Sequence, residues 1–242
     1  MPTTLYFSSA TLEVKKTMTR DNFYERFITR PLSHSQLESF RYNKEEWYNS
    51  YILGRKFSPN ALMKFGTRVG DAIGTPDCPI GIPTAGVKEF KLDAKLGDIY
   101  VVGYADHFCP VEIVLTENKT TDNPNKWTKE TVAKHKQLTM YCLMLALTHD
   151  IPPEDVTIYL NDIRTERYWT PKPGFENEPD YLLNEHIGDE AVRLKRPLEW
   201  NQYETERTTK DLVRYSKYVE KTVKRMYDYS VLREVELDNL KS

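Results

Sequence analysis

The sequence predicts an α/β fold: a central mixed sheet whose core order is helix, three strands, helix and strand, flanked by additional helices. Residues 88–96 alternate between apolar and charged side chains, which is typical of a strand buried on one face. Apolar runs at 99–108 and 111–120 follow after short turns and predict two more antiparallel strands. A helical pattern at about 128–148 then leads to an apolar strand at 156–163, and this crossover favours parallel pairing with a right-handed connection.

Two helices are predicted before the strands. Residues 1–32 are weakly patterned and end beside a proline, so we interpret them as an N-terminal extension. A helix is expected from Ser33, where two overlapping S/T-x-x-E/Q patterns can satisfy the free amides of a helix start, up to Gly54. A second helix is expected over 61–73, and the proline- and glycine-rich stretch up to Gly86 indicates a loop.

The remainder of the chain is less patterned. Residues 164–187 are interpreted as a polar excursion. A long helix is predicted from about Gln202 to Tyr229, because apolar side chains recur along one side of it, at Leu212, Tyr215, Val219 and Met226. These boundaries predict an extension (1–32), a core (33–163), and a final region (164–242) in which the excursion is followed by a long C-terminal helix packed on the core.

Composition excludes several classes of protein. The chain has 34 Lys+Arg against 36 Asp+Glu, a formal charge of −2, which excludes an indiscriminately cationic nucleic-acid coat. Its cysteines, Cys78, Cys109 and Cys142, form no C-x-x-C pair and are too few for a disulfide framework or a four-cysteine zinc or iron–sulfur site. No signal-peptide pattern and no 18-residue apolar run occurs, so we expect a cytoplasmic protein that does not contact membranes.

The strongest candidate for chemistry is Glu117-Asn118-Lys119, at the end of the third predicted strand. Glu117 and Lys119 are two residues apart, so they should share the face of Ile113 and Leu115, which is expected to be buried. A carboxylate and an ammonium at the edge of a buried face need a partner or a function.

Spacing alone does not distinguish this motif, because the chain has three more acidic-x-Lys pairs, interpreted as ordinary solvated charges: Glu13-x-Lys15, Glu89-x-Lys91 and Asp93-x-Lys95. Its context does. Asp106 lies near the end of the neighbouring strand, three residues after Gly103. Gln137 and Tyr141 are four residues apart and should lie on one face of the following helix.

Together these residues resemble the PD-(D/E)XK nuclease superfamily, specifically its RecB-like and phage exonuclease branch. The resemblance rests on Gly103-Tyr104-Ala105-Asp106, on Glu117-Asn118-Lys119-Thr120 and on Gln137-x-x-x-Tyr141, and extends to Ser33-His34-Ser35-Gln36-Leu37 and Phe65-Gly66-Thr67. It spans about residues 33–161. It implies a restriction-endonuclease-like fold with 33–163 as a nuclease core.

The resemblance implies a metal-dependent DNA nuclease, an exonuclease or a recombination or repair end-processing enzyme. Asp106, Glu117 and the main-chain carbonyl of Asn118 would bind Mg²⁺, or Mn²⁺ in its place. Lys119 would orient the attacking water or help to deprotonate it, and Gln137 and Tyr141 would hold the DNA strand or its terminal phosphate near this centre. The alternatives are a non-catalytic nucleic-acid-binding module that retains the fold and an interaction protein with coincidental charges.

The sequence departs from the family pattern in two places. This branch commonly has a histidine where this chain has Gly70, and either the adjacent Asp71 supplies the missing metal ligand or it is a solvated helix residue. Some members of the branch hold an iron–sulfur cluster with four cysteines, which this chain cannot do; their cysteine-proline pair is replaced by Tyr42-Asn43.

Two groups of basic residues are candidates for contact with DNA phosphates. The group nearest the predicted site is preferred: Lys126, Lys129, Lys134 and Lys136. A stripe on the C-terminal helix is interpreted as a solvated face: Arg207, Lys210, Arg214, Lys217, Lys221 and Lys224. The five histidines show no metal-ligand spacing. A homo-oligomer or a recombination partner protein is left open.

Overall fold

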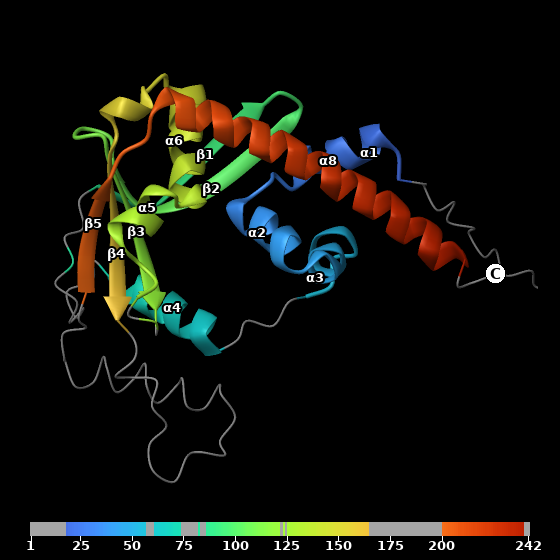
Figure 1. Ribbon diagram of the computed structural model, residues 1–242, viewed down its shortest axis with the longest axis horizontal. Helices are drawn as coiled ribbons and strands as arrows, with labels where there is room; N and C mark the ends of the chain where they lie inside the picture. Colours follow the sequence, from blue (N-terminus) through green and yellow to red (C-terminus); the bar gives the residue numbers. More distant parts are fainter. Residues whose placement is uncertain are drawn as a thin grey trace, which may run out of the picture.

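The computed structural model describes residues 18–56, 61–73, 82, 86–121, 123, 125–164 and 200–239. Its centre is a five-stranded mixed sheet in the order β1-β2-β3-β4-β5 (Figure 1). The strands are β1 (Val87–Leu96), β2 (Ile99–Cys109), β3 (Val114–Thr121), β4 (Thr157–Arg164) and β5 (Trp200–Thr205). Only the β3–β4 pair is parallel. The predicted fold class is therefore confirmed, including the crossover between the third and fourth strands.

Helices lie on both sides of this sheet. They are α1 (Arg20–Thr29), α2 (His34–Tyr42), α3 (Lys44–Trp47), the π-helix η1 (Tyr48–Ile52), α4 (Ala61–Ala72), α5 (Lys129–Ala133), α6 (Lys136–His149), the 3₁₀ turn η2 (Pro153–Asp155) and α8 (Thr209–Asn239). The apolar helix α6 packs on β1 and β2, and α8 packs in turn on α6. The buried side of α8 carries the predicted Leu212, Tyr215, Val219 and Met226. Burial of the apolar side chains of the whole core, to which these four belong, is the main driving force for the fold.

Two elements were not predicted. The helix α1 begins at a Thr19–Asn22 capping box and buries Phe23 and Phe27 in the main core, although its region was interpreted as an extension. The strand β5 pairs antiparallel with β4, so the long helix begins at Thr209 and not at Gln202. The strand was missed because an edge strand can be largely polar: in β5 no residue is fully buried. The boundaries proposed for the extension, core and final region remain a prediction.

Two predicted helices are interrupted. The expected helix from Ser33 to Gly54 divides at Asn43, whose side chain accepts a hydrogen bond from the Glu46 amide and so starts a new helix. The expected helix at 128–148 divides at Lys134 and His135 into α5 and α6. Both breaks redirect the chain, and the second one brings His135 next to the predicted site.

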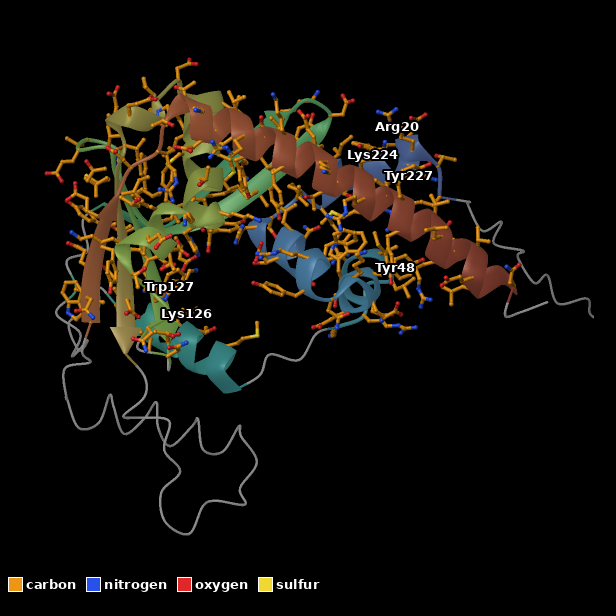
Figure 2. The ribbon with its side chains drawn as sticks, viewed as in Figure 1. Arg20, Tyr48, Lys126, Trp127, Lys224 and Tyr227 are labelled. Atoms are coloured by element: carbon orange, nitrogen blue, oxygen red, sulfur yellow. The ribbon has the colours of Figure 1, made fainter. Side chains whose placement is uncertain are left out.

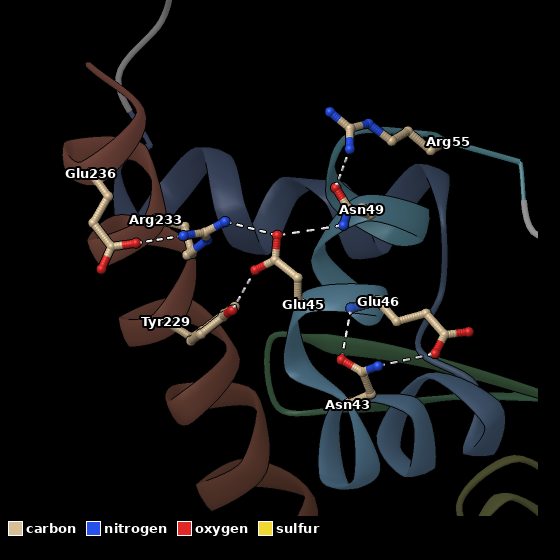
Figure 3. Close-up of polar contacts among 8 residues, drawn as sticks. All are labelled: Asn43, Glu45, Glu46, Asn49, Arg55, Tyr229, Arg233 and Glu236. Carbon is tan, nitrogen blue, oxygen red and sulfur yellow. Dashed lines mark hydrogen bonds and ion pairs between the residues drawn. The ribbon is translucent and has the colours of Figure 1, made fainter. Parts of the chain in front are cut away.

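A polar cluster joins α3 to the C-terminal half of α8. Glu45 accepts hydrogen bonds from the Tyr229 hydroxyl at 3.0 Å and from Arg233 at 2.7 Å, while Arg233 also pairs with Glu236 at 2.6 Å (Figure 3). The shared carboxylate links two segments that are 188 residues apart in the sequence. Because Arg233 is only about one quarter exposed, its ion pairs are less screened than those of a fully solvated arginine.

Several predictions lie partly or wholly outside the described residues. These are the loop between α4 and β1, most of the polar excursion, Cys78, and the Glu13-x-Lys15 pair. Within the described part, Cys142 is buried and Cys109 is partly buried, both as free thiols. No helix among the described residues is long and apolar enough to cross a membrane.

Candidate active site

Asp106 lies where strands β2 and β3 separate. Their ladder ends with the pair His107–Thr116, so the two strands form no further ladder pairs beyond this point. Asp106 instead accepts a hydrogen bond through Oδ2 from the main-chain amide of Asn118, at 2.5 Å. Because the amide and carbonyl of one strand residue project toward the same neighbouring strand, the Asn118 carbonyl should also face this gap. Asp106 and the main chain of Asn118 therefore meet at one place.

Glu117 is buried, and the partly exposed Lys119 lies beside it. Glu117 is only 2% exposed, and Lys119 donates a hydrogen bond to its Oε1 at 2.5 Å. The predicted shared face is confirmed for Leu115, which is fully buried; Ile113 lies in a turn instead. The other carboxylate oxygen of Glu117, Oε2, is buried without a hydrogen-bond partner among the described residues.

The charges of the pair follow from this burial. Desolvation raises the pKa of Glu117 to about 7, against the opposing effect of Lys119, and the nearby Asp106 carboxylate raises it further. Desolvation alone would lower the pKa of Lys119, but Glu117 and Asp106 outweigh it and raise that pKa. Desolvation also raises the pKa of Asp106. Asp106 and Glu117 repel each other when both are ionised. A bound cation would therefore stabilise their charged forms.

Tyr141 and Gln137 reach this place from α6. Gln137 Nε2 donates to the Tyr141 hydroxyl at 2.6 Å, and that hydroxyl donates to the carbonyl of Tyr104 at 2.6 Å. The predicted common helix face is thus confirmed. Gly103 makes the approach possible, because a Cβ at this position would lie 2.5 Å from the Tyr141 ring. Tyr141 is buried, and this desolvation is the main cause of the raised pKa of its hydroxyl. The nearby Glu117 carboxylate raises that pKa further.

The side chain of Asn118 is engaged away from Glu117. It accepts a hydrogen bond from Asn161 at 2.8 Å, and Asn161 accepts one from Gln202 at 3.1 Å, which links β3, β4 and β5. Asn118 therefore contacts Asp106 through its main-chain amide and not through its side chain. The role of its carbonyl as a metal ligand stays a prediction.

Three further side chains lie together and were not predicted as site residues, and two of them, His34 and His135, are near Lys119. His34 at the start of α2 and His135 before α6 have ring centroids 6.1 Å apart, and the Trp127 ring lies 5.0 Å from that of His135. Desolvation, and then the Lys119 ammonium, lowers the pKa of His34 to about 4 and of His135 to about 3. Both rings are neutral at pH 7. Their spacing in sequence gives no signal, because α2 and α6 meet only in the folded chain.

A buried carboxyl group belongs to the residue that pairs with Lys119 on the neighbouring strand. Asp162 of β4 is fully buried and lies opposite Lys119 in the parallel β3–β4 register. It lies in the apolar run that predicted this strand and is not among the predicted site residues.

The predicted phosphate-contacting lysines differ in their partners. Lys126 lies over the Trp127 ring, and both are at the end of the molecule near α4 and the carboxyl ends of β3 and β4 (Figure 2). Lys134 pairs with Glu130 at 2.5 Å, whereas Lys136 lies 3.8 Å from the ring centroid of Tyr218. Lys129 is exposed.

Arg207 is buried, so the interpretation of the whole basic stripe as a solvated face is wrong for this residue. The other members are exposed, as expected of a solvated face, but Arg207 is only 2% exposed. It donates to the carbonyls of Val132 and His135 at 3.0 and 3.1 Å and to the Thr139 hydroxyl at 2.8 Å. A guanidinium can be buried when its donors are satisfied in this way, and here it fixes the junction of α5 and α6.

The donor set suits a small divalent cation. Among the described residues no three histidine, cysteine, aspartate or glutamate side chains gather as a metal-holding group. Asp106 and Glu117 nevertheless supply two carboxylates, and the orphaned Oε2 of Glu117 is a buried anionic oxygen that requires a partner. Mg²⁺ is commonly held by one or two carboxylates, with waters and substrate phosphates completing its coordination. The residues present therefore fit such an ion.

Comparisons with known proteins support the fold. No protein-family model and no curated protein sequence matches the chain. A solved structure described as "Putative exonuclease" from Eubacterium rectale is similar at 12% identity and a TM-score of 0.51, covering 89% of this chain and 88% of that chain. A phage-related exonuclease from Haemophilus somnus 129PT has 13% identity, a TM-score of 0.47, and coverage of 82% and 83%. The first likeness shows that this chain shares its fold with that protein.

Proposed function

We propose that the chain is a metal-dependent DNA nuclease of the PD-(D/E)XK superfamily, and that it acts as an exonuclease or as an end-processing enzyme in recombination or repair. The fold shared with the Eubacterium rectale protein supports a nuclease. The observation that carries the proposal is the buried Glu117: its Oε2 has no hydrogen-bond partner in the part of the chain that the structure describes, and Asp106 and Lys119 lie beside it. Burying a carboxylate with one oxygen unpaired costs free energy, and a cation bound to that oxygen would offset the cost.

In this proposal Asp106, Glu117 and the Asn118 carbonyl hold one or two Mg²⁺ or Mn²⁺ ions. The ion would lower the pKa of a water molecule and neutralise the charge that develops on the phosphate. Asp106 is already oriented by the Asn118 amide, so the centre is preorganised by the main chain of β3. The hard oxygen donors match the preference of these ions.

The remaining residues position the substrate. Lys119 is an ammonium held by Glu117, and it would orient the attacking water and donate to the scissile phosphate. Gln137 is partly exposed and is fixed by Tyr141, so it can present its amide to a DNA strand or its terminal phosphate. The lysines at 126, 129, 134 and 136 would contact the backbone, and such contacts make affinity dependent on salt.

The test uses end-labelled linear and circular DNA, single- and double-stranded, incubated with Mg²⁺, Mn²⁺ or EDTA. Metal-dependent shortening of linear molecules while circles survive supports an exonuclease. Asp106→Asn and Glu117→Gln should each abolish cleavage while circular dichroism shows an intact fold, because each removes an anionic oxygen without changing shape. Asp93→Asn, an exposed carboxylate on β1, is the matched control.

Three outcomes contradict the proposal. Cleavage by either site variant at the parental rate in saturating metal would mean that the metal site is misplaced. Binding of DNA without metal-dependent cleavage would indicate a non-catalytic nucleic-acid-binding module. Absence of DNA binding altogether would indicate an interaction protein.

A further inference from the structure

A small cavity lies between α1, α2 and the segment formed by α3 and η1, which are the helices drawn in blue in Figure 1. Its volume is about 240 Å³, below the roughly 300 Å³ at which pockets for drug-sized ligands begin. Aromatic rings form much of its lining, from Phe23, Phe27, Trp47 and Tyr51. A cavity of this size and lining suits a single apolar side chain.

Trp47 brings an unpaired donor to this cavity. Its side chain is only 1% exposed, yet the indole Nε1 has no hydrogen-bond partner in the described part of the chain. Buried polar groups are nearly always paired, because an unpaired one has lost its bonds to water without replacement. Since Trp47 lines the cavity, a ligand that accepts a hydrogen bond there would satisfy the indole.

The cavity is also positively charged. Arg26 and Arg30 line it, whereas no aspartate or glutamate of the described residues does. Arg26 Nη1 donates to the carbonyl of Ile52 at 3.3 Å. Arg30 Nη1 donates to the carbonyl of Tyr51 at 3.4 Å. A guanidinium has five N–H donors, so these bonds hold both groups at the cavity and leave donors for an anion.

The acceptors around the cavity are already engaged. The carbonyls of Tyr51 and Ile52 accept from the two arginines, as described above. The carbonyl of Pro31 accepts from Nε2 of Gln36, another lining residue, at 2.9 Å. A nucleobase would bring amino or imino donors that need acceptors on the protein, whereas a carboxylate brings acceptors alone. The available groups therefore favour an apolar side chain beside a carboxylate over a nucleotide.

The cavity and the candidate active site lie on different sides of α2. His34 has its ring 6.1 Å from that of His135, in the group of side chains near Lys119. Gln36 lines the cavity instead. Residues two apart on a helix project about 200° apart, so His34 and Gln36 point in nearly opposite directions. The cavity is therefore separate from the proposed metal centre.

We propose that this cavity binds the C-terminal residue of a partner protein. An apolar or aromatic side chain would lie between the aromatic rings of the lining. The acceptors of that residue, its carboxylate and the preceding carbonyl, would be shared among Arg26, Arg30 and the Trp47 indole. Capture of a C-terminal carboxylate is a recurring mode of peptide recognition, and pairing with guanidinium groups makes its hydrogen bonds charge-assisted. This inference goes beyond the proposed nuclease activity and does not depend on it.

The test measures binding of fluorescein-labelled peptides by fluorescence anisotropy, without DNA or metal. The peptides end in phenylalanine, tryptophan or leucine with a free carboxylate, and each has a C-terminally amidated counterpart. At least one free acid should bind saturably. Its amide should bind about tenfold more weakly or worse, because amidation removes the charge and one acceptor oxygen.

Variants of the lining residues locate the binding. Arg26→Gln and Arg30→Gln should each weaken binding of the free acid about tenfold or more and reduce its preference over the amide. Trp47→Phe keeps a ring but removes the N–H donor, and should weaken binding as well. Arg30 is exposed, so its variant keeps the test valid if the Trp47 variant fails to fold. Arg20→Gln is the matched control, because it removes an exposed arginine of α1 that does not line the cavity.

Four results would overturn the inference. They are equal binding of acid and amide, an equal loss of affinity in Arg20→Gln, absence of binding by every free acid, and displacement of the bound peptide by a 5′-phosphorylated thymidine dinucleotide. The last result would assign the cavity to DNA. No readout involves metal or cleavage, so this inference can fail while the proposed nuclease function stands, and the reverse also holds.

Discussion

The pH dependence of metal binding provides the sharpest test of the site, because it follows from the burial of one residue. Glu117 must lose its proton to bind a cation, and its pKa is raised from 4.5 to about 7. At pH 5 only about 1% of such a group is ionised, so the apparent affinity should be about 100-fold weaker than at pH 8. That factor corresponds to about 2.7 kcal/mol at 1.36 kcal/mol per pH unit. A solvated glutamate would already be about three-quarters ionised at pH 5.

The assay is a titration with Mn²⁺ between pH 5 and pH 8.5, followed by the electron paramagnetic resonance signal of the free ion. Affinity should rise about tenfold per pH unit below about 7 and level off above it. The metal-free protein should show the opposite trend in stability: between about pH 4.5 and pH 7 the folded state holds a proton that the unfolded state has lost, so the free energy of unfolding falls as pH rises. An affinity that stays constant from pH 5 to pH 8 would refute the reasoning, since it would mean that Glu117 is either ionised throughout or not a ligand.

Three further predictions concern the surroundings of Glu117. Lys119→Ala should reduce cleavage on the order of a hundredfold or more, whereas Lys91→Ala and Lys95→Ala, which remove exposed lysines of β1, should leave the rate near that of the parent; equal losses in a cleavage assay would indicate bulk charge. Tyr141→Phe should lower activity while changing stability by only about 1 kcal/mol, because the ring stays and one hydroxyl is lost; a melting curve beside the cleavage assay checks this, and full activity would exclude that hydroxyl from the mechanism. Gly103→Ala should destabilise the fold by about 1–3 kcal/mol, a fall of about 2–4 °C per kcal/mol in calorimetry, since its Cβ would lie 2.5 Å from the Tyr141 ring; an unchanged melting temperature would show that the ring can move away freely.

Much of the sheet could be predicted because its strands have strong local patterns. In β1 the apolar side of the alternation is the more buried one, with Leu92 and Ala94 in the core and Lys91 and Asp93 exposed. The order of elements then left few topologies to consider, and the parallel β3–β4 pair followed from the crossover. Local pattern and global fold agree in this part of the chain.

The missed features depend on contacts between distant segments. The burial of Arg207 could not be foreseen from a helical charge pattern, because it requires carbonyls of residues more than seventy positions earlier. His34 and His135 are 101 residues apart by their numbers and carry no common spacing, yet both lie near Lys119. The helix α1 had a readable signal, a Thr19–Asn22 cap followed by Phe23 and Phe27 four residues apart.

The location of the site has a physical reason in the hydrogen bonding of the sheet. A continuous ladder would pair the Asn118 amide with a carbonyl of β2 and leave no room for an anion. Here the β2–β3 ladder ends at His107 and Thr116, and the carboxylate of Asp106 accepts that amide instead. The same residue lies opposite Glu89, where the β1–β2 ladder is also interrupted. Asp106 thus occupies a gap in both of its ladders, and the buried Glu117 carboxylate of β3 lies near enough to repel its charge. The mutual repulsion of these groups in a poorly solvated place is what a divalent cation would relieve.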